Sequence, residues 1–176
     1  MPLSSVQQYV QKQLDGLEMP AGIPNLEAWI TPPTVEDMDA PRAYIWASRM
    51  RARRQTGPRV NVYASGPGFK HLDWTIDVYL SYETTPDTDT KDTDFPGICD
   101  AVMTKLWTTT MPIFIDANGN TIALDGPTAP TDANSQILAI GEEFDFEYPP
   151  ERVPATLRML YFTARFGFNV YEAVQA

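Results

Sequence analysis

A cysteine–histidine nucleophile pair would have to be built from Cys99 and His71, because the chain holds one Cys and one His. Such a pair needs the imidazole within hydrogen-bond reach of the thiol, so that it can take the thiol proton. His71 falls on the polar side of an expected strand, and Cys99 falls on the apolar stripe of an expected helix. A buried Cys without a basic partner is usually a small core residue. We therefore interpret Cys99 as core and predict no catalytic residue.

Carboxylates are numerous, and they keep one enzymatic alternative open. Asp73 and Asp77 share the polar side of one expected strand, and Glu143 lies on another. Alternating acids on a strand usually form a solvated face, and nothing in the sequence places two of them across a substrate. A small carboxylate-dependent hydrolase is the alternative from a different class.

The segment 116–120 carries the first oxygen ligands of a calcium loop but lacks the later acidic ligands and the closing Glu. Asn118-Gly119 stands between two short apolar runs, 112–115 and 121–124, which favours a hairpin with a type I′ turn. A single Cys also excludes an intrachain disulfide and a zinc site built from several cysteines. We predict no metal and no cofactor.

Charge placement is more informative than any motif. The 176 residues include 13 Lys+Arg and 23 Asp+Glu, for a formal charge of −10. Six of the basic residues are Arg between positions 42 and 59. Within that cluster, Arg49, Arg51 and Arg53 form a basic row with two-residue spacing. In the C-terminal third, Glu143, Asp145 and Glu147 form an acidic row with the same spacing. The rows could pair across neighbouring strands of one sheet or between copies of the chain, since Arg suits carboxylate contacts at interfaces.

The Arg cluster is not predicted to be a high-affinity DNA site. The sequence pI is about 4.4, and no groove-reading helix or RNA-binding motif is present. A body with a charge of −10 repels phosphate, although DNA could pass such a surface without sticking.

Four stretches with alternating apolar and polar residues predict long strands, at 43–55, 71–82, 136–148 and 157–174. In the first, the alternation puts Tyr44, Trp46, Ser48 and Met50 on one face and Ile45, Ala47, Arg49, Arg51 and Arg53 on the other. Spacings of three and four predict helices over 6–17 and from Asp94, the expected N-cap, to about 110. The predicted fold class is α+β, with a mainly antiparallel sheet of about four long strands, two helices packed on one face and a small β-hairpin.

The length and composition indicate one α+β domain over residues 1–176. Residues 19–42 are rich in Pro and are expected to be extended rather than regular, packing Leu26, Trp29 and Ile30 onto the domain. Residues 83–94 are expected to form an acidic loop. No apolar run approaches the roughly 20 residues of a membrane span, and the first residues lack the pattern of a secretory signal.

The arrangement of elements resembles the tail terminator proteins of long-tailed bacteriophages. The most suggestive part is the strand His71–Tyr82, which runs through the acidic loop into a helix beginning Asp94-Phe95-Pro96-Gly97-Ile98. The resemblance implies a non-enzymatic virion protein, assembled in the host cytoplasm, that forms a homohexameric ring. Such a ring caps the tail tube, stops its polymerisation and joins it to the neck, with DNA passing through the lumen without specific binding and no membrane partner.

Within that resemblance, the two charge rows become the predicted subunit interface. Opposite rows on one chain suit a head-to-tail contact, which is the kind that closes a ring. The implied partners are further copies of the chain, the tail tube protein and a neck or head completion protein. Another connector component, such as a head completion or stopper protein, is the alternative. The predicted interface residues are Arg49, Arg51 and Arg53, facing Glu143, Asp145 and Glu147.

Overall fold

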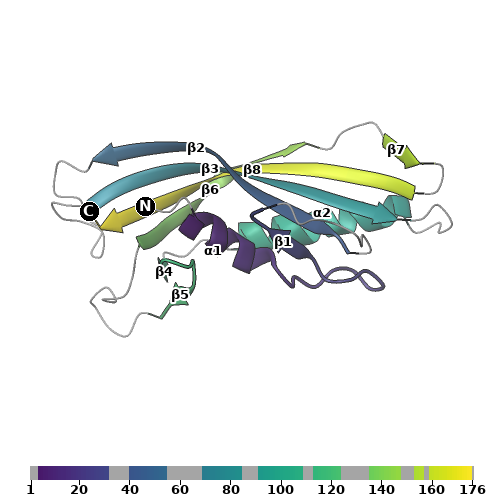
Figure 1. Ribbon diagram of the computed structural model, residues 1–176, viewed down its shortest axis with the longest axis horizontal. Coiled ribbons are helices and arrows are strands. Elements are labelled where there is room, and N and C mark those ends of the chain that lie inside the picture. The colour runs from purple at the N-terminus through teal and green to yellow at the C-terminus, as the bar shows by residue number, and fades with distance from the viewer. Residues whose placement is uncertain are drawn as a thin grey trace.

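The computed structural model describes residues 4–31, 40–54, 69–84, 91–108, 113–123, 135–147, 153–156 and 159–175. In this part of the chain, one eight-stranded sheet packs with two helices (Figure 1). The sheet order is β1-β2-β3-β8-β6-β4-β5, and β7 pairs with β8. The elements are α1 Ser4–Leu14, β1 Glu27–Trp29, β2 Arg42–Arg54, β3 Phe69–Thr84, α2 Lys91–Trp107, β4 Ile113–Ile115, β5 Thr121–Ile122, β6 Ser135–Glu147, β7 Val153–Thr156 and β8 Met159–Gln175.

The predicted fold class was wrong about the sheet. The four long strands β2, β3, β6 and β8 belong to a larger, curled and mixed sheet, not to an antiparallel sheet of four strands with helices on one face. It is mixed because β1 pairs in parallel with β2. Strands of two to four residues, such as β5 and β7, carry too little alternation to be recognised in a sequence. The right-handed twist of strands as long as 17 residues accumulates into the curl.

The centre of the sheet is the antiparallel pair β3 and β8, in register from Phe69↔Gln175 to Thr84↔Leu160. Alternate residues of β3, such as Trp74, Ile76 and Val78, are buried toward the helices, as the period of two predicts. Helix α1 contacts β1 and β2, whereas α2 contacts β3, β6 and β8. The largest fully buried side chains of the described residues include Tyr9, Phe95, Phe166, Leu14, Leu26 and Ile45.

The hairpin β4–β5 forms where it was predicted, but its turn is not type I′. Gly119 has a φ of +73°, while no described non-glycine residue has a positive φ, so Asn118 cannot take the conformation that type I′ requires. Asp116 organises the turn, since its carboxylate accepts hydrogen bonds from the backbone N–H groups of Asn118 and Asn120, both at 2.8 Å. The Asn120 side-chain amide also donates to Asp116 Oδ2 at 2.6 Å, and this bond is the largest cause that lowers the pKa of Asp116, ahead of the two backbone bonds.

The tip of this hairpin packs against helix α1. Gly119 is buried, and a Cβ placed on it would lie 2.6 Å from the backbone nitrogen of Tyr9 and 2.7 Å from the backbone oxygen of Ser5. The Lys12 side chain donates a hydrogen bond to Asn120. A small loop that is distant in sequence is thus fixed to the helix by a contact that only glycine permits.

Two expectations about the chain around the helices were wrong. Helix α2 begins at Lys91, so Asp94 lies inside it and is not the N-cap, and Pro96 is accommodated at an exposed position in the second turn. The Pro-rich segment contains the regular strand β1, since none of its prolines falls within Glu27–Trp29. Leu26 is buried as expected, and Trp29 and Ile30 are half-buried. Residues 32–39 of that segment and 85–90 of the acidic loop lie outside the described residues.

No helix in the described part of the chain is long and apolar enough to span a membrane.

Candidate interaction surface

The sheet has a second face, turned away from the core, that carries the candidate functional residues. We refer to it as the polar face; in β3 it consists of His71, Asp73, Thr75, Asp77, Tyr79 and Ser81. Their register partners continue this face across β8 and β6. Asp77 lies opposite Gly167, which lies opposite Asp145, and Tyr79 lies opposite Arg165, which lies opposite Glu147.

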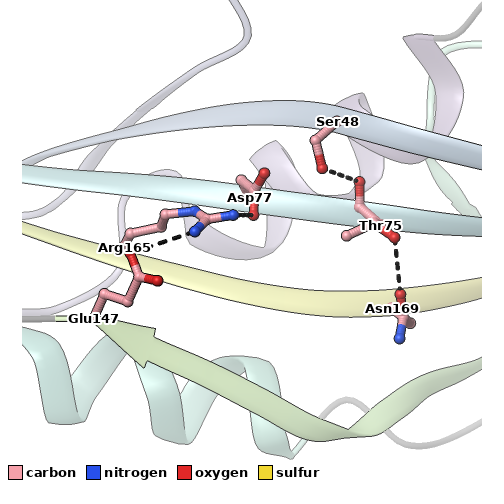
Figure 2. Close-up of polar contacts among 6 residues, drawn as sticks. All are labelled: Ser48, Thr75, Asp77, Glu147, Arg165 and Asn169. Atoms are coloured by element: carbon pink, nitrogen blue, oxygen red, sulfur yellow. Dashed lines mark hydrogen bonds and ion pairs between the residues drawn. The ribbon is translucent and has the colours of Figure 1, made fainter.

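A β-bulge at Ser48 decides which side of β2 belongs to the polar face. Ala47 pairs with Ile76 and Arg49 pairs with Thr75, so Ser48 is an extra residue. Its hydroxyl donates a hydrogen bond to the backbone oxygen of Thr75 at 3.3 Å (Figure 2). The bulge shifts the alternation by one residue. The predicted faces of this strand were therefore wrong, because Arg49 and Arg51 share the polar face with Tyr44 and Trp46, and Met50 points to the core side.

The middle of the polar face holds a network of three charged residues from three strands (Figure 2). The Arg165 guanidinium donates to Asp77 Oδ1 at 2.9 Å and lies 3.4 Å from Glu147 Oε2. The Asp77 side chain is 3 % exposed, although it stands on the polar face, while that of Glu147 is 67 % exposed. The hydrogen bond and charge of Asp77 raise the pKa of Arg165 above its already high value, so this group stays charged.

Neighbouring residues complete the surroundings of this network. Gly167 lies beside the Asp77 carboxylate: a Cβ there would be 3.4 Å from Asp77 Oδ1, an ordinary van der Waals distance. The Tyr79 ring centre is 6.0 Å from the Arg165 guanidinium carbon, within the range of a cation–π contact. Two aromatic side chains beside the network, Trp46 and Tyr79, are 59 % and 45 % exposed. The sequence reasoning missed Arg165; the available signal was an Arg between Thr163 and Asn169 on the polar side of the strand expected at 157–174.

Replacing Arg165 by Met is expected to lower the melting temperature by several degrees. The Asp77 carboxylate would remain buried without its donor, and a buried acceptor left unpaired is costly. Arg165→Lys keeps a positive charge, so its melting temperature should fall by less than that of Arg165→Met. Thermal unfolding followed by circular dichroism measures both, and equal melting temperatures for the wild type and Arg165→Met would contradict a structural role of the network.

The predicted charge rows occupy opposite sides of the polar face. Arg49 and Arg51 in β2 are exposed, and so are Glu143, Asp145 and Glu147 in β6. The backbone of Arg53 continues the first row opposite His71. Arg42, from the same Arg cluster, is mostly buried and lies 3.6 Å from Glu27 of β1.

The two rows do not pair with each other within the chain. Strands β3 and β8 lie between β2 and β6, and three strand spacings amount to about 14 Å. A direct ladder between the rows, one of the two alternatives drawn from the sequence, is thereby excluded. The acid row is also less regular than its spacing indicated, because the register of β6 against β8 shifts between Ile140 and Phe144, and Glu143 lies in that shift.

The other residues singled out for chemistry are not brought together. His71 stands on the polar face, whereas Cys99 is buried on α2 in the core on the other side of the sheet. Asp73 and Asp77 are four residues apart on one strand, about 13 Å, and Glu143 is on β6 beyond β8. The described residues contain no group of three or more His, Cys, Asp or Glu side chains that could hold a metal ion.

Cys99 is expected to be unreactive in the folded protein. Burial, together with a smaller contribution from the nearby charge of Asp100, raises the pKa of its thiol to about 12. Because the thiolate is the reactive form, a raised pKa leaves almost none of it at pH 8. Ellman's reagent should detect no thiol in the native protein and one per chain in guanidinium chloride. Rapid labelling of the native protein would contradict the buried placement.

No model of a known protein family matches this sequence, and no curated protein matches it. The geometry of the polar face is therefore the basis for inferring function.

Proposed function

We propose that this chain is a structural protein that assembles into a ring, and that it is the tail terminator of a long-tailed bacteriophage. The order of the elements supports the phage assignment through its resemblance to that family. The ring assignment rests on one observation. An exposed basic row and an exposed acidic row lie at opposite sides of one sheet face, too far apart to neutralise each other within the chain.

A contact between copies brings the two rows together, while Glu147 also keeps its contact with Arg165 of its own chain. If the basic row of one copy meets the acidic row of the next, each contact uses two different surfaces. The same contact can then be repeated from copy to copy until the last copy meets the first and the ring closes. Each exposed ion pair contributes only about 0.2–1 kcal/mol, so several pairs at every contact are needed to stabilise a ring. The expected assembly is therefore stable at moderate salt and weakens as salt rises, because screening shortens the reach of exposed charges.

The proposed ring caps the last ring of the tail tube with one side and offers the other to a neck or head completion protein. DNA passes through its lumen. The net charge of −10 disfavours binding of phosphate, so the passing DNA is not retained.

A tube-capping experiment tests this function. Purified protein is added to tail tube subunits while they polymerise, and the tubes are measured by negative-stain electron microscopy. We expect elongation to stop and a ring of density to lie at one tube end. Continued elongation with no protein at the ends would contradict the terminator role. Binding only to DNA-filled heads would instead support the head completion alternative.

A further inference from the structure

Two strand edges have no neighbouring strand in the described part of the chain. Strand β2 pairs with β3 along its length, but β1 covers its other edge only at Arg42–Tyr44. Strand β6 pairs with β8, and β4 covers its other edge only at Ser135–Ile137. The Ile45 carbonyl already accepts a hydrogen bond from Gln7 Nε2 at 3.2 Å. From Trp46 in β2 and from Ala139 in β6 onward, one edge of each strand therefore offers main-chain N–H and C=O groups for pairing.

The directions of these strands allow one sheet to continue into the next copy. Strands β2, β3, β8 and β6 are neighbours in that order, and each neighbouring pair is antiparallel. Strand β6 consequently runs opposite to β2. A second copy in the same orientation would place its β2 antiparallel beside β6, and the same step can be repeated from copy to copy.

We propose that the open edge of β6 in one copy pairs with the open edge of β2 in the next. In the antiparallel register, Arg49 lies opposite Glu147, Met50 opposite Phe146, and Arg51 opposite Asp145. This inference rests on the proposed ring and specifies its subunit contact.

The charged side chains support this register. Arg49 and Arg51 are exposed on the polar face, as are Asp145 and Glu147. Directly opposite residues of an antiparallel pair point to the same side of the sheet, where opposite charges attract. The register therefore places both basic side chains against acidic ones. The next pair on the same face in this register is Arg53, by its backbone position, with Glu143, which lies in the irregular part of β6.

The apolar side chains between the charges support the same register independently. Met50 and Phe146 point to the core side of the sheet, yet they are 50 % and 44 % exposed. The proposed pairing places them opposite each other and removes both from water. Phe146 already packs on Phe166, with ring centres 5.0 Å apart. A Met beside an aromatic ring adds a favourable sulfur contact, so the pairing would extend an existing cluster.

Disulfide trapping tests the register. The double variant Met50→Cys/Phe146→Cys carries one new thiol on each edge, and Cys99 is buried and does not compete. Mild oxidation should give a ladder of covalent oligomers on a non-reducing gel, ending at the ring size and collapsing with dithiothreitol. An equimolar mixture of the two single variants should give dimers as its main product.

The matched control is Trp46→Cys/Phe146→Cys. Trp46 is also exposed on β2, but its side chain lies on the polar face, whereas that of Met50 lies on the core side. This variant should therefore give no ladder. A ladder of equal strength from the control would overturn the register. Rings seen by electron microscopy without any ladder from the Met50 variant would overturn this contact and leave the proposed function standing. A protein that forms no rings at all would overturn both.

Discussion

Replacing Arg49 and Arg51 together by Glu is expected to reduce the assembled protein to monomers of 19.7 kDa. Both side chains are exposed, so their replacement removes attraction from the subunit contact with little effect on the core. The new carboxylates would then face Asp145 and Glu147 of the next copy, and like charges directly opposite each other are destabilising. Size-exclusion chromatography with light scattering measures the loss, and adding Arg53→Glu should not restore assembly.

A mixing experiment separates a subunit contact from a general effect of charge. The reciprocal variant, Asp145→Arg/Glu147→Arg, should be monomeric by itself for the same reason. It also replaces the exposed Glu147 partner of Arg165, while the bond from Arg165 to the buried Asp77 stays. Mixed in equal amounts, the two variants have complementary edges at every contact, so they should assemble into rings in which they alternate. Circular dichroism should show that each variant is folded. Rings from either variant alone, or no rings from the mixture of folded monomers, would contradict the assignment of the two rows.

Replacing Gly119 by Ala is expected to lower the free energy of unfolding by about 2–4 kcal/mol. The positive φ of +73° is unfavourable for any residue with a Cβ. The added methyl would also meet the backbone of Tyr9 and Ser5, at 2.6 and 2.7 Å, where no side-chain rotation gives relief. The hairpin would have to move off helix α1, which would break the contact between Lys12 and Asn120. Chemical denaturation measures the change.

Gly16→Ala is the matched control, because Gly16 has the same φ of +73° and nothing within 4 Å of its added Cβ. Gly16→Ala should lower the free energy of unfolding by about 1–2 kcal/mol, which is the cost of the positive φ alone. The difference between the two variants isolates the packing of the hairpin on α1. Equal losses would indicate that the hairpin tip does not rest on the helix.

The long strands were predictable because a period of two persists over more than ten residues in β3 and β8, and over shorter runs on each side of the irregularities in β2 and β6. The bounds of β3, 69–84, differ from the predicted 71–82 by two residues at each end. The size and type of the sheet were not predictable, since β1 and β5 have three and two residues. Such short segments join a sheet because a longer neighbour offers them an edge, and that neighbour is distant in sequence.

The candidate surface was predictable in its residue types but not in its geometry. The spacing of Arg49 and Arg51 correctly placed them on one side of a strand. The bulge at Ser48 changed which neighbours they have, and a one-residue insertion leaves no distinct mark in an alternating pattern. The contact of Asp77 with Arg165 joins residues 88 positions apart. Only the pairing of β3 with β8 brings them together.

The central claim is that copies of this chain close into a ring, and the mass of the assembled particle tests it most directly. Native mass spectrometry over a dilution series should give one discrete species at a fixed multiple of 19.7 kDa, six-fold if the family resemblance extends to ring size. That multiple should not change with concentration until the ring dissociates. A monomer at every concentration, or a continuous series of open oligomers, would contradict the claim.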